Sequence, residues 1–150
     1  MRKEVRFYHL QSQTMEQALP ALLSKAIQGG KNIIVKTSSE KLEKLNEHLW
    51  TYNPNTFLPH GSAKDGNAEL QLIWITDKDE NPNNAGILIL TENVTSDNTD
   101  HFDLCCEMFD GRIDEHVKDA RERWKVYKEK DGLDLSYWQQ TPQGGWDKKA

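Results

Sequence analysis

Residues 5–35 of the chain read VRFYHLQSQTMEQALPALLSKAIQGGKNIIV, and this stretch decides the fold. It opens at residues 5–10 with a β-rich run that is long enough for a strand and too short for a helix. Apolar residues then recur at helical spacing until the Gly29-Gly30 pair, which is a helix-stop signal. Residues 32–35 are a short, mostly apolar run, typical of a parallel strand with helices on both faces. The stretch therefore predicts a β-α-β unit.

The helix of this unit has a marked start and one misfit. Thr14, followed three residues later by Gln17, fits a capping box. Pro20 is the misfit, because a proline costs about 3 kcal/mol inside a helix and little in its first turn. We therefore expect the regular helix to begin nearer Leu19 than Thr14.

The rest of the chain continues this alternation. A second helix is expected next, capped by Ser38 or Ser39, with one apolar stripe that consists of Leu42, Leu45 and Leu49. Two further strands are expected at residues 70–75 and 86–90. Beyond them, four residues stand at i, i+3, i+4 and i+7 and predict a third helix: Phe102, Cys105, Cys106 and Phe109. A long polar helix should follow from about residue 114 to 130.

Strands and helices that alternate over one domain-sized chain predict an α/β fold. We expect a single three-layer, Rossmann-like domain over residues 1–150, with a mainly parallel central sheet. Residues 131–150 hold Trp138 and Trp146 among glutamine, glycine and lysine. This segment is expected to be a C-terminal tail that packs on the domain.

Composition and charge exclude several classes of protein. The 19 lysines and arginines against 24 aspartates and glutamates give a net charge of -5, which argues against a surface broadly attracted to nucleic acid or anionic lipid. The two cysteines are adjacent, no secretory signal opens the chain, and no apolar run approaches the roughly 20 residues that span a bilayer. A cytoplasmic protein with no membrane contact is expected.

Enzymatic motifs are missing from the sequence. The turn at residues 11–14 contains no glycine, so neither the dinucleotide fingerprint nor the P-loop is present. The five histidines lack metal-ligand spacing, and the paired cysteines fit the core. We expect no catalytic residue, no cofactor and no metal. One alternative stays open: a small α/β nucleotide- or phosphate-ester-binding enzyme that uses the carboxyl ends of the strands, with Ser12 or Thr37 in its cleft.

The late polar helix carries the first candidate binding surface. Residues 121–130 hold five cations, and Arg121, Trp124, Lys125 and Lys128 stand at i, i+3, i+4 and i+7, with Val117 one turn earlier. Fixed cations beside an aromatic side chain suit an acidic peptide that ends in a hydrophobic residue and a free carboxylate. Two alternatives remain: a solvated helix whose Trp124 packs inward, and a site for single-stranded nucleic acid, which the net charge disfavours.

The second candidate surface is the aromatic and proline-rich stretch at residues 49–61. Loops are normally polar, so these apolar side chains either fold back on the core or bury themselves in a partner: Trp50, Phe57, Leu58 and Pro59. A proline-stiffened loop binds with little ordering cost, as an interface anchor requires.

Several short motifs, spread over the full 150 residues, also occur in this order and spacing in a known family. They are FYHL at 7–10, LW at 49–50, FLPHG at 57–61, NAG at 84–86, MFDG at 108–111, RERWK at 121–125, YWQQ at 137–140 and GW at 145–146. In these motifs the chain resembles the chi subunit of bacterial DNA polymerase III holoenzyme, an accessory protein of the clamp-loader assembly. The resemblance implies a non-catalytic, Rossmann-like adaptor between the polymerase and single-stranded DNA-binding protein.

The resemblance also assigns residues to two partners. It places the acidic C-terminal tail of single-stranded DNA-binding protein on Val117, Arg121, Trp124, Lys125 and Lys128. It places the psi subunit, or a helicase-like repair protein as the alternative partner, on Trp50, Phe57, Leu58 and Pro59. His60 fits a buried structural role equally well. No direct contact with nucleic acid is implied.

Overall fold

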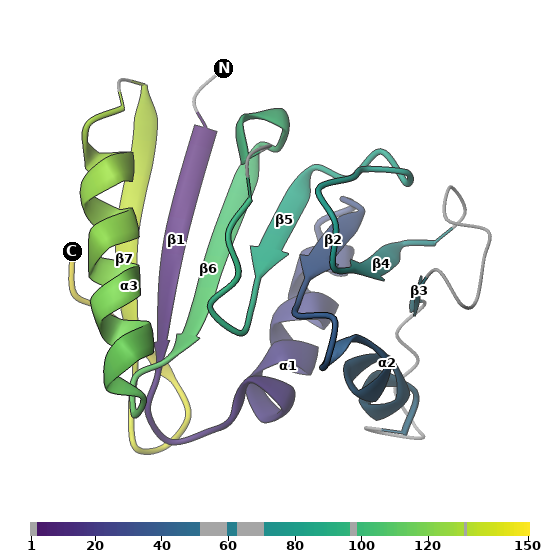
Figure 1. Ribbon diagram of the computed structural model, residues 1–150, viewed down its shortest axis with the longest axis horizontal. Helices are drawn as coiled ribbons and strands as arrows, with labels where there is room; N and C mark the ends of the chain where they lie inside the picture. Colours follow the sequence, from purple (N-terminus) through teal and green to yellow (C-terminus); the bar gives the residue numbers. More distant parts are fainter. Residues whose placement is uncertain (1–2, 52–59, 63–70, 97–98, 131) are drawn as a thin grey trace.

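The computed structural model describes residues 3–51, 60–62, 71–96, 99–130 and 132–150 (Figure 1). In this part of the chain, eight strands form one sheet in the order β3-β4-β2-β5-β6-β1-β7-β8. The strands are β1 (Lys3–Leu10), β2 (Ile33–Lys36), β3 (His60–Ser62), β4 (Ile73–Thr76), β5 (Ile87–Leu90), β6 (Leu104–Asp110), β7 (Leu133–Gln140) and β8 (Trp146–Lys148). The α-helices are α1 (Met15–Gln28), α2 (Leu42–Thr51) and α3 (Asp114–Lys128), and a 3-10 turn, η2, covers Thr99–His101.

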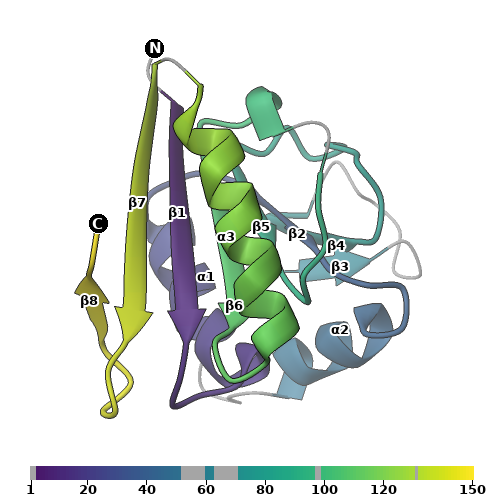
Figure 2. The same cartoon turned by 60° about the vertical axis from the view of Figure 1, so that its left-hand side comes forward.

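The architecture has three layers. Strands β1 to β7 are parallel, and β8 returns antiparallel to β7. Helix α3 covers one face of the sheet over β1, β6 and β7, whereas α1 and α2 lie on the other face (Figures 1 and 2). Within the described residues, no helix is both long and apolar enough to cross a bilayer. The predicted three-layer α/β fold with a mainly parallel sheet is confirmed.

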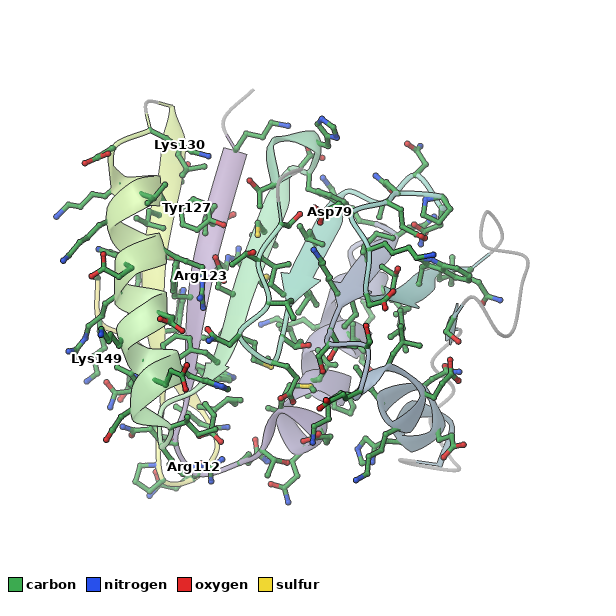
Figure 3. The ribbon with its side chains drawn as sticks, viewed as in Figure 1. Asp79, Arg112, Arg123, Tyr127, Lys130 and Lys149 are labelled. Atoms are coloured by element: carbon green, nitrogen blue, oxygen red, sulfur yellow. The ribbon has the colours of Figure 1, made fainter. Side chains whose placement is uncertain are left out.

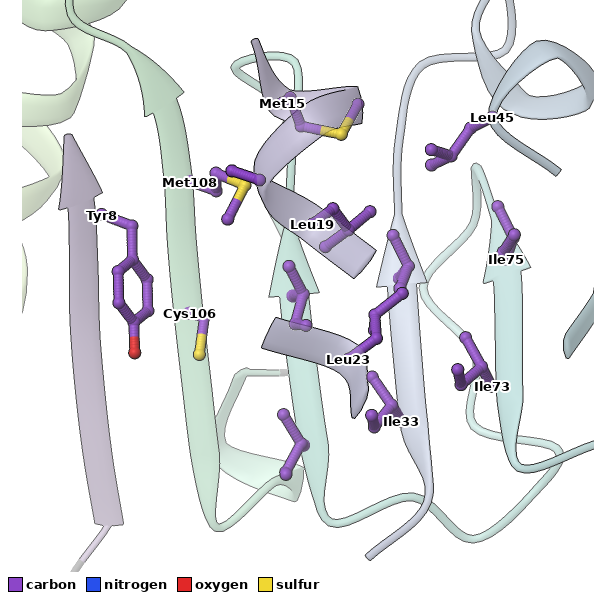
Figure 4. Packing of buried hydrophobic residues seen from close by; sticks show 14 of the residues in the cluster. Tyr8, Met15, Leu19, Leu23, Ile33, Leu45, Ile73, Ile75, Cys106 and Met108 are labelled. Carbon is purple, nitrogen blue, oxygen red and sulfur yellow. The ribbon is translucent and has the colours of Figure 1, made fainter. Parts of the chain in front are cut away.

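A buried apolar core lies on each face of the sheet. On the α1 side, Leu23 lies next to Ile33 of β2 (Figure 4), and Leu19, Leu23 and Ile33 are fully buried in the same cluster. On the α3 side, Phe7 of β1 and Phe109 of β6 are buried under the helix. Each such side chain contributes about 1.5–3 kcal/mol of hydrophobic stabilisation when it leaves water.

Helix α1 begins at its capping box, so the expected later start near Leu19 is wrong. The Thr14 side chain accepts from the Gln17 backbone N–H, and the Gln17 side chain accepts from Thr14 N–H. Pro20 lies inside the helix and leaves the Glu16 carbonyl without its intrahelical donor. The His48 Nε2–H of α2 donates to that carbonyl at 2.8 Å. A side chain from another helix therefore replaces the missing backbone donor, which makes the proline tolerable.

The predicted third helix at residues 102–109 is wrong, because this segment is the central strand β6. The strand lies between β5 and β1 and is buried on both faces, so apolar residues point to both sides of it and also satisfy a helical spacing. Cys105 faces the α3-side core and Cys106 faces the α1-side core. Both thiols are free and buried, and burial raises the pKa of Cys106 to about 12. The core role that was predicted for the two cysteines fits these positions.

The C-terminal segment at residues 131–150 also differs from the expected tail, because it supplies two strands of the sheet. Strand β7 pairs with β1 in parallel, and β8 closes a hairpin onto β7. Trp138 and Trp146 pack against the α1-side core, and the Trp146 ring lies 5.0 Å from the ring of Tyr8. The sequence LDLSYWQQ is rich in polar residues and only two of its eight residues are buried, so its hydrophobic pattern did not mark a strand.

Helix α3 is held on the sheet by a buried ion pair. The Arg123 Nε donates to Glu107 Oε1 of β6 at 2.8 Å, and the two side chains are only 15% and 1% exposed. Arg123 also donates to Asn93, whose side chain in turn donates to Asp119 of α3. Burial raises the pKa of Glu107, and the positive charge of Arg123 opposes that rise. The network fixes the rotation of α3 about its own axis.

We expect Arg123→Ala to lower the free energy of unfolding by about 3 kcal/mol or more in urea titrations, because it leaves the Glu107 carboxylate buried without its cation. Lys125→Ala is the matched control on the same helix. Its ion pair with Glu122 spans 3.5 Å and is mostly exposed, so the change should stay within about 0.5 kcal/mol.

The Arg123→Ala defect should also depend on pH. Without the cation, the raised pKa of Glu107 favours its protonated form in the folded state, so stability is retained at low pH and lost as the pH rises. The defect should therefore be smaller at pH 5 than at pH 8. A defect of equal size at both pH values would contradict the assignment to a stranded carboxylate.

Candidate functional site

Helix α3 begins after a tight turn at the end of β6. A Cβ added to Gly111 would lie 1.9 Å from His9 Nε2 and 2.7 Å from the Leu10 carbonyl oxygen, so only glycine fits there. Asp114 and Glu115 stand in the first turn of α3, and basic residues stand in its last turn. These charges match the helix dipole and place the cations toward the C-terminal end of the helix.

The inner side of α3 packs on β1 and β7. Ala120 and Tyr127 are buried, and the Trp124 ring meets the rings of Phe7 and Tyr137 edge-on, at 5.3 and 5.7 Å between centroids. Trp124 and Val117 are nonetheless only partly buried. Trp124 thus packs inward on one side and keeps part of its surface exposed, between the two orientations that the sequence left open.

The outer side of α3 carries the cations. Arg121, Lys125 and Lys128 are exposed, and no carboxylate within the described ranges forms an ion pair with Arg121 or Lys128. Lys125 has the weak, exposed pair with Glu122. A shallow depression of about 500 Å³ runs along this side and is lined by Asp114, Val117, Lys118, Arg121, Glu122 and Lys125.

The structure thus brings most of the expected residues together, with differences in placement. Val117, Arg121 and Lys125 share the depression, whereas Trp124 lies on the flank of the helix toward β7. Arg123, one of the five cations counted in the sequence, is turned inward onto Glu107 (Figure 3). Lys118 lines the depression and was missed, although its spacing of three and seven residues from Arg121 and Lys125 was visible in the sequence.

Two residues from the strands adjoin the flank that carries Trp124, and sequence reasoning missed both. His9 of β1 and Tyr137 of β7 are hydrogen-bonded through Nδ1 and the phenolic oxygen. Burial and the positive charge of Arg121 lower the pKa of His9. Burial raises the pKa of Tyr137, and Arg121 acts in the opposite direction. The positive charge of Arg121 therefore acts on the pKa of both His9 and Tyr137.

The turn after β1, where an open α/β sheet would bind a phosphate, is occupied by a side chain of this protein. The Gln140 carboxamide oxygen accepts from the backbone N–H groups of Gln11, Ser12 and Gln13 at 3.2, 3.1 and 3.0 Å. A phosphate group at this turn would have to displace the carboxamide. The alternative cleft residue Thr37 is buried. Among the described residues, no group of three histidine, cysteine, aspartate or glutamate side chains could hold a metal ion.

The second candidate surface falls largely outside the described residues. Trp50 belongs to the last turn of α2, and His60 opens β3. Phe57, Leu58 and Pro59 lie in the segment that the structure does not describe. Their assignment to a partner stays a prediction.

Comparisons with known proteins bear on the same regions of the chain. Residues 2–135 match the sequence model of the family described as DNA polymerase III chi subunit, HolC. A curated relative from Rickettsia prowazekii (strain Madrid E), described as a probable DNA polymerase III subunit chi, is 38% identical over 84 residues. The alignment covers 55% of this chain and 51% of the relative, so the chain spans about half the length of the curated relative it matches. The family match includes α3 and ends within β7.

We expect Arg121→Gln to raise the pKa of His9 toward its ordinary value, because a nearby positive charge disfavours protonation of the imidazole. Titration of the His9 ring protons by NMR measures this shift directly. Lys118→Gln removes an equal charge from the same depression, but Lys118 is not among the groups that shift the pKa of His9, so that pKa should stay unchanged. An unaltered His9 pKa in Arg121→Gln would contradict the proximity of the two groups.

Proposed function

Because the chain belongs to the family of DNA polymerase III chi subunits, we propose that it is a non-catalytic accessory protein of the replication machinery. In this role it links the clamp-loader complex, through the psi subunit, to single-stranded DNA-binding protein. The acidic C-terminal tail of single-stranded DNA-binding protein is the ligand of α3. Val117, Arg121, Trp124, Lys125 and Lys128 bind it.

The observation that carries the proposal is a set of exposed cations beside a partly buried indole, in a chain of net charge -5. Arg121 and Lys128 have no carboxylate partner in the described part of the chain, so they are available to an external anion. A guanidinium can hold a terminal carboxylate with two parallel hydrogen bonds, each worth about 1.5–3 kcal/mol when a charge takes part. The partly buried Trp124 and Val117 offer apolar surface to a hydrophobic terminal residue.

The psi subunit, or a helicase-like repair protein, is the proposed partner of Trp50, Phe57, Leu58 and Pro59. Two features support this second interface: the aromatic and proline-rich composition of the segment, and its resemblance to the family. The chain enters residues 52–59 from α2 and leaves them at β3, which is the strand at one edge of the sheet. Helix α3 covers the part of the sheet near the opposite edge (Figure 1). This separation suits a protein that holds two partners at once.

We expect purified protein to bind intact single-stranded DNA-binding protein in calorimetric titrations, and to lose that binding when the last residues of the tail are removed. Arg121→Ala should weaken binding at least about tenfold, because the carboxylate loses its charge-assisted hydrogen bonds. Lys25→Ala is a matched control, since it removes a cation from α1 on the other face of the sheet. Equal affinity for the intact and truncated partners would overturn the proposal.

The second interface has its own test. We expect the double variant Phe57→Ala/Pro59→Ala to lose co-purification with psi or with the helicase-like protein, because the apolar anchors of the interface are removed. The same variant should bind the acidic tail with unchanged affinity. If co-purification persists, the interface lies elsewhere on the chain.

A further inference from the structure

A row of four neighbouring residues crosses the sheet beneath α3. Glu107 of β6, Phe7 of β1 and Tyr137 of β7 are register partners on adjacent strands. Beyond Tyr137, the backbone N–H groups of Lys149 and Ala150 both donate to the Tyr137 carbonyl oxygen, at 2.7 and 3.4 Å. Lys149 and Ala150 thus both stand opposite Tyr137, which is the pattern of a β-bulge. Lys149 is therefore the next member of the row.

The row faces α3. Glu107 pairs with Arg123, and the rings of Phe7 and Tyr137 contact Trp124. Lys148 points to the opposite face, because its Nζ lies 6.0 Å from the centroid of the Trp138 ring on the α1 side. Lys149 follows β8 directly and stands opposite Tyr137, and opposed residues of paired strands share a face of the sheet, so Lys149 belongs to the α3 face. In Figure 2 the C-terminal end of the chain lies next to β7, at the edge of the sheet that α3 covers.

Neighbouring residues of α3 contact the row in the order in which its strands lie in the sheet. Arg123 lies over Glu107, and Trp124 lies over Phe7 and Tyr137. Lys149 is one strand farther out, on the side of α3 that carries Trp124. Arg121 and Lys128 stand three residues before and four residues after Trp124, so they share that side of the helix.

We propose that the strand pair β7–β8 forms the second side of the acidic-tail site, and that Lys149 binds the carboxylates of the tail across from Arg121 and Lys128. This inference rests on the proposed tail-binding function and extends it to a part of the chain beyond the family match, which ends at residue 135. The tail lies between two sets of cations, with Trp124 and Tyr137 between them. The lowered pKa of His9 and the opposed rise at Tyr137 are consistent with a guanidinium near these rings.

The β7–β8 side of the proposed site carries a negative charge, Asp147, as well as the positive charge of Lys149. Asp147 pairs in register with Gln139, and it follows Trp146, whose ring contacts Tyr8 on the α1 side, so Asp147 also faces α3. It precedes Lys149 by two residues and is exposed. An acidic peptide is attracted at Lys149 and repelled at Asp147, so its carboxylates gather near the Lys149 end.

The test compares variants of neighbouring residues in the full-length chain. Fluorescence anisotropy with a labelled peptide of the acidic tail, at low salt, measures the dissociation constant. Lys149→Gln should weaken binding at least threefold. Lys148→Gln removes the same charge one residue away on the other face of the sheet, and should change affinity by less than 1.5-fold. Asp147→Asn should tighten binding about twofold.

The possible outcomes separate this inference from the proposed function. If Arg121→Ala weakens binding but Lys149→Gln does not, the second side of the site is wrong and the proposed function stands. Equal losses in Lys148→Gln and Lys149→Gln would also overturn the inference, because net charge alone would then explain them. If wild-type protein does not bind the peptide, both proposals fail. Unchanged thermal unfolding midpoints in the three variants confirm that the fold is intact.

Discussion

The position of every side chain on α3 depends on the ion pair between Glu107 and Arg123. The Arg123 guanidinium reaches Glu107 Oε1 only in one rotation of the helix, and either charge alone would be costly inside the protein. With Arg123 directed to β6, the next residue, Trp124, turns toward β1 and β7, and Arg121 is left in solvent. The buried Arg123 does not belong to the proposed tail site. Its ion pair nevertheless determines which cations of α3 are exposed.

The sequence alone was sufficient for elements whose signals are local. The capping box at Thr14, the amphipathic helix at residues 114–128 and the short apolar strands β2, β4 and β5 all lie close to where periodicity and turn residues placed them. Strand β6 was mistaken for a helix because burial on both faces removes the alternation that identifies a strand. Strand β7 was missed for the opposite reason, since its polar residues carry little apolar signal. Both errors arise because the burial of β6 and the pairing of β7 depend on strands that are distant in the sequence.

In the candidate site, too, local features could be predicted from the sequence and contacts between distant segments could not. The row of cations on α3 follows from helical spacing, so Arg121, Lys125 and Lys128 could be predicted, and Lys118 could have been added. The inward turn of Arg123 could not be foreseen, because its partner lies 16 residues away on a strand that was misassigned. The contributions of His9 and Tyr137 depend on β1 lying between β6 and β7, a topology that spacing along the chain does not reveal.

This topology has a consequence for how the protein is made. Both neighbours of strand β1, namely β6 and β7, are synthesised about 100 residues or more after it. At translation rates of about 5–20 residues per second, the unpaired backbone edges of β1 wait on the order of 5–20 s for a pairing partner. Such non-local pairing is slow and leaves a nascent strand open to aggregation. The strand on which α3 rests is therefore without both of its pairing partners until most of the sheet has been synthesised.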